Sequence, residues 1–361
     1  MATTGSRPLA VCYLAHARFP TEKAHGAQIV KTCEAFADAG AAVTLLVPGR
    51  KTGIAEDAFD YYGAKRNFAL VSLATPDFVR FGPLGFALSL LLFSEAARAH
   101  PSFFRADVVY SRDAFVLLQY VLLGRKLVYE AHTRPTVLSR FLARRAHRVI
   151  VISGGLRDAY RAAGVRPDRI VVAHDAIDPE PFRVSPDGAA VRAELGIPSG
   201  KRIALYVGKV DAAKGVPTFA AASEYLPDDV LAVIIGEGDE KPALLKTHPK
   251  ALFLPGTPYR DLPRVLAAAD ALVLPNSELD EDASRYTSPL KAFAYLASKK
   301  PIAASDVPAL REILEGAAEF AAPDDPTALA AAITRALEAP PRPPADDHSW
   351  AARAGTILSA L

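Results

Sequence analysis

The chain has 361 residues, of which 50% are hydrophobic and 23% are charged. This length exceeds the size at which one hydrophobic core keeps growing, so we expect two globular domains. The formal net charge of +2 is too small to favour nucleic acid as a partner. Cys12 and Cys33 lie in apolar patterns, so we expect buried thiols, no disulfide and a cytoplasmic location. No signal peptide is expected, because Met1 to Pro8 is short and polar.

Short aliphatic runs alternate with helical patterns along almost the whole chain, which predicts an α/β protein with parallel sheets. The strands predicted in the first half are 9–15, 42–48, 107–111, 126–132, 148–153 and 169–176. Those predicted in the second half are 202–208, 230–236, 251–256, 271–276, 301–305 and 319–322. The proline- and glycine-rich stretch 179–200 is predicted to be a linker or hinge. A proline cluster from Pro340 to Pro344 precedes a last predicted helix over 349–361.

The longest apolar run, FGPLGFALSLLLF, covers residues 81–93 and follows Arg80. Gly82, Pro83 and Gly85 interrupt it, and it is too short to span a bilayer. One interpretation is a buried helix. The other is a helix that lies against a membrane surface.

A loop that contains His25 and Gly26 follows the first predicted strand and leads into a helix with one apolar face. Ligands of open α/β sheets bind outside the carboxyl ends of the strands, so this loop is placed for function. The loop is not a GxGxxG turn, and the short GEG sequence at 236–238 does not by itself support nicotinamide dinucleotide binding.

His132 ends the predicted strand 126–132, at the same carboxyl edge of the first sheet. A histidine at that edge can hydrogen-bond a sugar or a phosphate. The alternative is a structural histidine whose ring nitrogens are satisfied inside the protein.

Two lysines follow the strand 202–208 on a loop bounded by glycines. Lys209 and Lys214 lie between Gly208 and Gly215, at the edge where ligands gather. Ammonium groups bind phosphate as compact point charges. The alternative is a pair of solvated loop lysines.

A helix is predicted to start in the segment TSPLKAFAYLASKKPIAASDVPALREIL, residues 287–314. Ser288 is predicted to be its N-cap and Pro289 its first residue. Lys291 then lies in the first turn, where the helix dipole disfavours a cation unless an anion is bound there. The alternative is an ordinary amphipathic helix with Lys291 reaching solvent. Together with the lysine loop, this helix start predicts a ligand that carries pyrophosphate.

No metal site is predicted. Asp280-Glu281-Asp282 has the form of a DxD motif, but it lies in a charged loop and the lysines already supply positive charge. No Cys/His metal-ligand spacing and no Ser/His/Asp nucleophile motif stands out.

Over nearly its whole length the chain resembles the retaining glycosyltransferases of the GT-B fold, in particular the bacterial family four and its SPLK-type subgroup. Five segments carry the resemblance and occur in the family's order. They are HGAQIVKTCEAFADAGAAVTLL, VIVISGGLRDAYRAAGVRPDRIVVAHDAID, LYVGKVDAAKG, FLPGTPYRDLPRVLAAADALVLPNS and the segment 287–314 quoted above.

The resemblance implies two Rossmann-like, doubly wound parallel-sheet domains that face a cleft. Residues 1–178 would form an acceptor domain, 179–200 a linker, 201–340 a nucleotide-sugar domain, and 341–361 a helix that crosses back to the first domain. The implied activity is transfer of a sugar from an NDP-sugar to an acceptor hydroxyl with retention, without metal or cofactor, since the NDP-sugar is a substrate. The implied acceptor is a saccharide or a lipid-linked molecule of the cell envelope, with peripheral contact at the inner face of the plasma membrane.

The resemblance also assigns residues to roles. The catalytic group would be His132, Lys209 and Lys214, with His25 on the acceptor side. The donor-binding group would be Gly26, Gly208, Thr257, Thr287, Ser288, Leu290, Lys291 and Ala294.

The chain departs from the family at two positions, where glutamates separated by seven residues are typical and Tyr286 and Ala294 stand instead. Ala294 is expected to leave the ribose edge of the donor to water and so to weaken the donor site. A catalytically silent GT-B protein that binds nucleotide or a partner transferase is therefore the alternative function. A nucleotide-sugar epimerase of the same fold is disfavoured, because no pair of carboxylates for proton abstraction is identifiable.

Overall fold

The computed structural model describes residues 7–183, 186–340 and 347–361. These residues form two compact units. The first unit contains residues up to 152 together with 156–174 and 350–361, and the second contains 153–155 and 175–349. Residues 341–346, which hold most of the predicted proline cluster, and residues 1–6 of the polar N-terminus lie outside the described residues.

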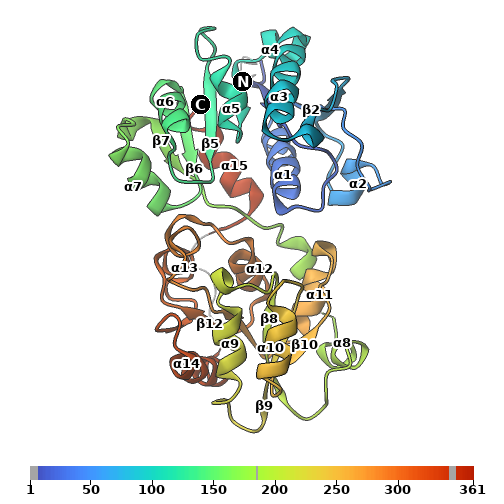
Figure 1. Ribbon diagram of the computed structural model, residues 1–361, viewed down its shortest axis with the longest axis vertical. Helices are drawn as coiled ribbons and strands as arrows, with labels where there is room; N and C mark the ends of the chain where they lie inside the picture. Colours follow the sequence, from blue (N-terminus) through green and yellow to red (C-terminus); the bar gives the residue numbers. More distant parts are fainter. Residues whose placement is uncertain (1–6, 184–185, 341–346) are drawn as a thin grey trace, which may run out of the picture. The chain divides into compact units, whose positions relative to one another are not determined.

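The first unit is a seven-stranded parallel sheet flanked by helices (Figure 1). Its strand order is β3-β2-β1-β4-β5-β6-β7. The strands are β1 (Ala10–Leu14), β2 (Ala42–Pro48), β3 (Ala69–Leu73), β4 (Val108–Ser111), β5 (Leu127–Ala131), β6 (Arg148–Val151) and β7 (Ile170–Val172). The helices are α1 (Ala24–Asp38), α2 (Ala58–Tyr62), α3 (Gly82–Ala99), α4 (Pro101–Arg105), α5 (Ala114–Leu118), α6 (Val137–Arg145), α7 (Gly154–Ala162) and α15 (Trp350–Leu358).

Helix α1 shows how the apolar pattern builds the core of this unit. Ile29, Val30, Cys33 and Phe36 repeat at helical spacing, and each is at most 1% exposed. The C-terminal helix α15 packs against α1 in the same core. The last helix of the chain is therefore part of the first unit.

The second unit is a six-stranded parallel sheet with the order β10-β9-β8-β11-β12-β13. The strands are β8 (Arg202–Val207), β9 (Val230–Ile235), β10 (Leu252–Leu254), β11 (Ala271–Leu274), β12 (Ile302–Ser305) and β13 (Glu319–Ala321). The helices are α8 (Gly188–Glu194), α9 (Val216–Ala222), α10 (Lys241–Thr247), α11 (Leu262–Ala267), α12 (Leu290–Ser298), α13 (Pro308–Leu314) and α14 (Pro326–Glu338).

Helices cover both faces of this second sheet, so its central strands are apolar on both sides. In β8, Ile203, Leu205 and Val207 belong to one core cluster, whereas Ala204 and Tyr206 belong to the other. This period of two follows from the pleat of the strand. The same double coverage explains why continuous aliphatic runs predicted the strands.

All twelve predicted strands occur, with ends that differ from the prediction by a few residues. The prediction missed β3, an edge strand whose residues are only half-buried and give a weak apolar signal. The predicted linker 179–200 is wrong, because this stretch is part of the second unit. Val191 of α8 and Ile197 are buried in its core, and these apolar contacts outweigh the proline and glycine content.

Each sheet has one point at which the chain reverses the direction of winding. In the first unit this point lies between β1 and β4, and in the second between β8 and β11. In open α/β sheets, ligands bind at the carboxyl ends of the strands beside such a point. The two candidate sites are therefore expected on the loops that follow these strands.

Candidate functional site

The loop after β8 is held in place by glycines and by a short 3-10 helix, Ala212–Lys214. The Asp211 carboxylate caps this helix by accepting the Lys214 backbone N–H at 2.9 Å. Gly215 has a φ of 66°, and a Cβ there would lie 1.7 Å from the carbonyl oxygen of Pro275. Only glycine lets this loop pack against the chain that follows β11.

Helix α12 brings a second lysine to the same edge. The Lys291 ammonium donates a hydrogen bond to the Tyr206 hydroxyl at 2.7 Å and lies 3.9 Å from the centre of the Tyr206 ring. Gly208 has a φ of 146°, and a Cβ there would lie 2.9 Å from Lys291 Nζ. Gly208 therefore leaves the space that the lysine side chain occupies.

Positive charge is concentrated at this edge. Burial lowers the pKa of Lys291 to about 7, the Lys214 ammonium lowers it further, and Asp211 partly opposes the shift. Within the part of the chain that the structure describes, the Lys214 ammonium forms no hydrogen bond or ion pair. An anion placed here would stabilise both ammonium groups.

The N-terminus of α12 differs from the predicted one. The helix begins at Leu290, Pro289 occupies the N-cap position, and no side chain caps the helix. The prediction that Ser288 is the N-cap is wrong, because its hydroxyl accepts the backbone N–H of Asp175 at 2.9 Å. The alternative with Lys291 in solvent is also wrong, since its ammonium lies on Tyr206.

Ala294 does not occupy the predicted position at an open edge. It is 0% exposed and belongs to the core cluster of the second unit. The next residue, Tyr295, fixes the helix to the sheet by accepting the Val207 backbone N–H at 3.1 Å. The expectation that Ala294 leaves a ribose edge to water is therefore wrong, because neighbouring side chains cover it.

The other predicted residues of the second unit contribute less. Lys209 is exposed and pairs with Asp211 at 3.0 Å, and hydrogen bonding to that carboxylate raises the pKa of Lys209. Thr257 follows β10, Thr287 is extended before α12, and Leu290 is half-buried as the first residue of α12. Of the residues predicted as catalytic or donor-binding, the structure brings Lys214 of the catalytic group together with Gly208 and Lys291 of the donor-binding group.

The acidic run before α12 stabilises its own segment. The Asp280 carboxylate accepts the Ala283 backbone N–H at 2.8 Å. Glu281 accepts a hydrogen bond from the Tyr286 hydroxyl at 3.2 Å. The two carboxylates thus support the π-helical turn Asp282–Tyr286 that leads to α12.

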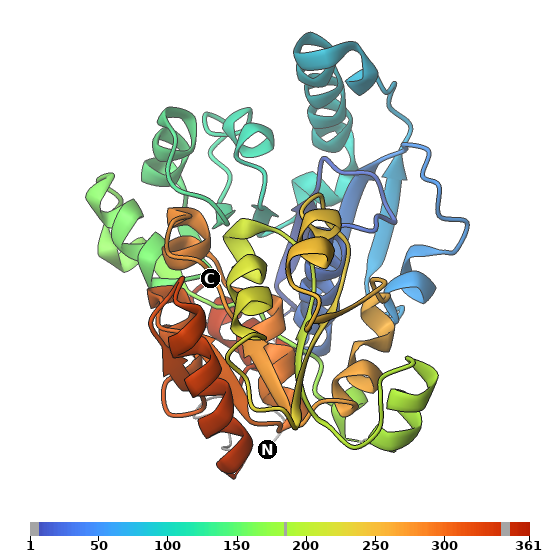
Figure 2. The ribbon, with the colours of Figure 1, turned by 60° about the horizontal axis from the view of Figure 1, so that its bottom comes forward.

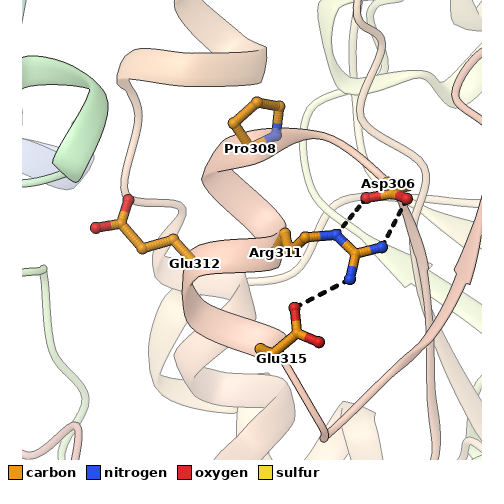
Figure 3. Close-up of a pocket in the computed structure, with 5 residues that line it drawn as sticks. All are labelled: Asp306, Pro308, Arg311, Glu312 and Glu315. Atoms are coloured by element: carbon orange, nitrogen blue, oxygen red, sulfur yellow. Dashed lines mark hydrogen bonds and ion pairs between the residues drawn. The ribbon is translucent and has the colours of Figure 1, made fainter.

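A surface hollow of about 530 Å³ elsewhere on the second unit is lined by side chains of α13 and of the turn before it (Figure 3). Arg311 donates two hydrogen bonds of 2.6 Å to Asp306 and one of 3.0 Å to Glu315. Its guanidinium also lies over the ring of Phe320. The guanidinium is already paired with two carboxylates of the protein, so this hollow is not the anion site.

The first unit contains a cavity of about 370 Å³ at the carboxyl edge of its sheet. This volume lies in the range of small-molecule sites. The loops after β1, β4 and β5 line it, together with residues of α1, α5, β5 and α6. The lining residues are Ala15, His16, Ala17, His25, Ile29, Arg112, Asp113, Ala114, Phe115, Tyr129, Thr133, Thr136 and Ser139.

Two histidines of this cavity are held neutral. Burial lowers the pKa of His25, and Arg112 lowers it further. Burial also lowers the pKa of His16 to about 4, with a further contribution from Arg50, which contacts its ring. Neutral imidazoles exchange hydrogen bonds with hydroxyl groups, so the cavity suits a polyhydroxylated ligand.

Gly26 supports the loop of the first unit internally. A Cβ there would lie 2.1 Å from the Tyr62 hydroxyl and 2.7 Å from Thr21 Cγ2. That hydroxyl donates to the Thr21 carbonyl at 2.8 Å and accepts the Thr21 N–H at 2.7 Å. The missing side chain makes room for Tyr62, so Gly26 does not hold an open approach for a phosphate.

His132 lies at the end of β5 and is tied to a buried carboxylate. Its Nε2 is 2.8 Å from Glu130 Oε1, and its side chain is 14% exposed. Glu130 itself is fully buried.

Helix α3 is longer than the apolar run that predicted it. Pro83 lies in the first turn, and Gly85 packs where a Cβ would lie 2.0 Å from the Phe78 carbonyl oxygen, so neither breaks the helix. By length and composition alone, Val79–Ala99 is long and apolar enough to cross a membrane, which corrects the prediction that it is too short. Only 28% of its apolar 18-residue window is buried in the protein, and Figure 2 shows α3 (teal) projecting from the first unit.

Comparisons with solved structures show which fold this is. The chain superposes on Anabaena HepE in complex with UDP and glucose with a TM-score of 0.68, at 19% identity, over 97% of this chain and 95% of that one. It superposes on sucrose-phosphate synthase from Thermosynechococcus elongatus with a TM-score of 0.71, at 17% identity, over 98% of both chains. These likenesses establish the GT-B fold and confirm the predicted fold class.

Both units also match sequence families. Residues 26–181 match Glycosyltransferase Family 4, and residues 201–339 match Glycosyl transferases group 1. At the level of the superfamily, this is a glycosyltransferase of the GT-B fold.

Relatives of this glycosyltransferase match over shorter stretches. The Bacillus subtilis protein named for teichuronic acid biosynthesis, TuaC, is 32% identical over 149 residues, which are 40% of this chain and 35% of that protein. D-inositol 3-phosphate glycosyltransferase of Mycobacterium bovis is 29% identical over 125 residues, which are 31% of this chain and 25% of that protein. The matched segments thus span about a third or less of the length of these relatives.

Several residues of the glycosyltransferase site were not predicted from the sequence. Tyr206 gives no signal, because an aromatic residue in a strand is typical of a core. His16 and Glu130 give weak signals. His16 directly follows a buried strand, and Glu130 is a carboxylate inside a strand that is covered on both faces, which requires a partner.

Proposed function

We propose that this glycosyltransferase moves a sugar from an NDP-sugar to an acceptor hydroxyl with retention of configuration. One observation carries the proposal: the ammonium groups of Lys214 and Lys291 lie near each other where the second sheet reverses its winding. Among the described residues, no carboxylate forms an ion pair with either ammonium group. A diphosphate is the anion that a nucleotide-sugar brings to such a place.

The lysines would act on the leaving group. Cleavage of the bond between sugar and diphosphate leaves negative charge on the diphosphate, and fixed ammonium groups stabilise that charge without reorganisation. These ammonium groups supply the positive charge that a divalent metal would otherwise supply, so we assign neither metal nor cofactor. Retention is proposed because the order of motifs resembles retaining enzymes of family four.

The acceptor is proposed to bind the cavity of the first unit. His16 and His25 line this cavity as neutral rings, which suits the hydroxyl groups of a saccharide. A saccharide or a lipid-linked saccharide of the cell envelope fits this chemistry. The name of the relative TuaC agrees with such a role.

A peripheral membrane contact through α3 is part of the proposal, at the inner face of the plasma membrane. Phe81, directly before α3, is 61% exposed, and Leu84, Leu88 and Leu91 of α3 are 85%, 44% and 52% exposed, which is an unusual exposure for neighbouring apolar side chains. Arg80 lies over the Phe81 ring at the start of this surface and supplies a cation for anionic lipid headgroups.

A catalytically silent nucleotide-binding protein is the second candidate. One feature favours it: Tyr286 and Ala294 stand at the two positions where the family that this chain resembles typically carries glutamates. Such a protein would bind nucleotide without turning over any donor.

Thermal shifts with a panel of nucleoside diphosphates and NDP-sugars test the donor site, because a ligand of the folded state raises the melting temperature. Lys214→Met and Lys291→Met are each expected to lose most of the shift, whereas Lys246→Met, an exposed lysine of α10, should keep it. Equal shifts in all variants would exclude the lysine site. A shift without sugar transfer to any acceptor would favour the silent protein.

A further inference from the structure

A fully buried carboxylate lies beside His132 in the first unit. Glu130 is 0% exposed and accepts hydrogen bonds from four side chains. The donors are Gln28 Nε2 at 2.6 Å, the Tyr110 hydroxyl at 2.5 Å, Arg353 Nη2 at 2.7 Å and His132 Nε2 at 2.8 Å. A buried carboxylate stays ionised only when it is paired and hydrogen-bonded, and here both conditions hold.

The balancing charge comes from the last helix of the chain. Arg353 of α15 is 5% exposed, and its Nε donates to the His174 carbonyl at 2.8 Å, while Nη1 donates to Thr32 Oγ1 at 3.3 Å. Burial by itself raises the pKa of Glu130. The Arg353 charge, followed by the hydrogen bond from His132, outweighs burial and holds that pKa below its ordinary value. Glu130 and Arg353 thus form a neutral pair inside the unit.

This pairing decides which nitrogen of His132 carries the proton. An ionised carboxylate can only accept hydrogen bonds, so Nε2, at 2.8 Å from Glu130, must carry a hydrogen. In residues 7–183, 186–340 and 347–361, Nδ1 has no hydrogen-bond partner, and the ring is partly exposed. Nδ1 therefore carries a lone pair that can accept a hydrogen bond.

We propose that Glu130 and Arg353 are positioning residues that orient the His132 ring with a hydrogen on Nε2, so that Nδ1 accepts a hydrogen bond from a substrate hydroxyl. A neutral nitrogen lone pair repels a phosphate oxygen, so His132 takes a hydroxyl group and not a phosphate. The assignment of that hydroxyl to a sugar rests on the proposed function. The C-terminal helix α15 then contributes to the site in the first unit through Arg353.

Other charged or titratable groups of the first unit surround this pair and enter the same balance. They are Tyr110 on β4, His25 and Cys33 on α1, Tyr13 on β1 and Arg112 after β4.

Nitrogen-15 NMR of the histidine rings in the ligand-free full-length protein tests the proposal. In the parent protein, the His132 ring is expected as the Nε2–H tautomer near neutral pH. In Arg353→Met the unbalanced carboxylate should raise the His132 titration midpoint by about one pH unit or more, and in Glu130→Gln the unbalanced arginine should lower it. Arg353→Lys and the double variant Glu130→Gln/Arg353→Met, which keep the charge balance, should stay near the parent.

The opposite signs distinguish positioning from structural support. Shifts of the same sign in Arg353→Met and Glu130→Gln, no shift in either, or an Nδ1–H tautomer in the parent would overturn the proposal. If Arg353→Met does not fold, Glu130→Gln and the double variant still decide between these outcomes. His25→Asn is the matched control, and it is expected to change the midpoint less than the two charge-unbalancing variants.

A turnover measurement separates this proposal from the proposed function. With His132 protonated, Arg353→Met should lose at least about tenfold in kcat/KM at neutral pH and regain part of it at higher pH. Absence of turnover in the parent would refute the proposed function and leave the titrations standing. If the variants shift the His132 titration midpoint but their kcat/KM stays at the parent value, the positioning role alone is refuted.

Discussion

Lys291 is expected to couple diphosphate binding to proton uptake. The pKa of its ammonium falls from an ordinary 10.5 to about 7, because the side chain is buried against Tyr206 and lies near Lys214. At pH 8 about nine-tenths of the free protein would then have Lys291 neutral. An anion favours the charged form, so binding takes up close to one proton, and the affinity falls by up to about tenfold per pH unit above 7.

The loss of affinity on removing the Lys291 charge follows from the strength of the hydrogen bond that is lost. A charge-assisted hydrogen bond contributes about 1.5–3 kcal/mol, so Lys291→Met should weaken nucleoside diphosphate binding by about 10- to 150-fold at pH 7. Between pH 7.5 and 9 the diphosphate is fully ionised, so any change in affinity there reports on the protein. Lys291→Arg should bind with an affinity that no longer depends on pH in this range, since guanidinium does not titrate.

Calorimetry in two buffers with different ionisation enthalpies measures the proton uptake directly. The parent protein should take up close to one proton per diphosphate at pH 8, whereas Lys291→Arg should take up none. Lys246→Met is the control for the loss of a surface charge and should behave as the parent. A parent affinity that is constant from pH 7.5 to 9 with no proton uptake would refute the reasoning.

Three further predictions concern single positions. Ala294→Glu should lower the free energy of unfolding by about 2–4 kcal/mol in urea denaturation, because it buries a carboxylate in the core. Tighter NDP-sugar binding with an unchanged free energy of unfolding would contradict the buried position of residue 294. Gly208→Ala should displace the Lys291 side chain and weaken diphosphate binding about tenfold or more, measured by calorimetry, whereas Gly355→Ala, where a Cβ meets no neighbour, should bind normally. Leu84→Glu combined with Leu91→Glu should abolish flotation with anionic liposomes at low salt, and a parent protein that never floats would exclude the membrane contact.

The apolar pattern predicted the fold because both sheets are covered on both faces. Continuous runs such as Arg202–Val207 are visible in the sequence for that reason, and the half-exposed β3 is not. The order of elements also placed the candidate sites, because loops after parallel strands meet at one edge. Lys214 and Lys291 were predicted to lie at that edge in this way.

The partners of individual side chains could not be predicted, because they come from segments distant in sequence. The Ser288 hydroxyl is bound by the Asp175 N–H, and Gly26 makes room for Tyr62, although both residues looked like parts of a phosphate site. Glu130 and Arg353 are separated by 223 positions and show their connection only in the folded protein. Local capping and turn rules carry no information about such contacts.

The most direct test of the central claim is the turnover of NDP-sugars, followed by release of the nucleoside diphosphate and by NMR of the anomeric carbon of the product. The parent protein is expected to consume at least one donor, to yield a product with the anomeric configuration of that donor, and to lose activity when Lys214 and Lys291 are both replaced by methionine. A parent that binds a nucleoside diphosphate at these lysines but turns over no donor, or a product of inverted configuration, would contradict the account.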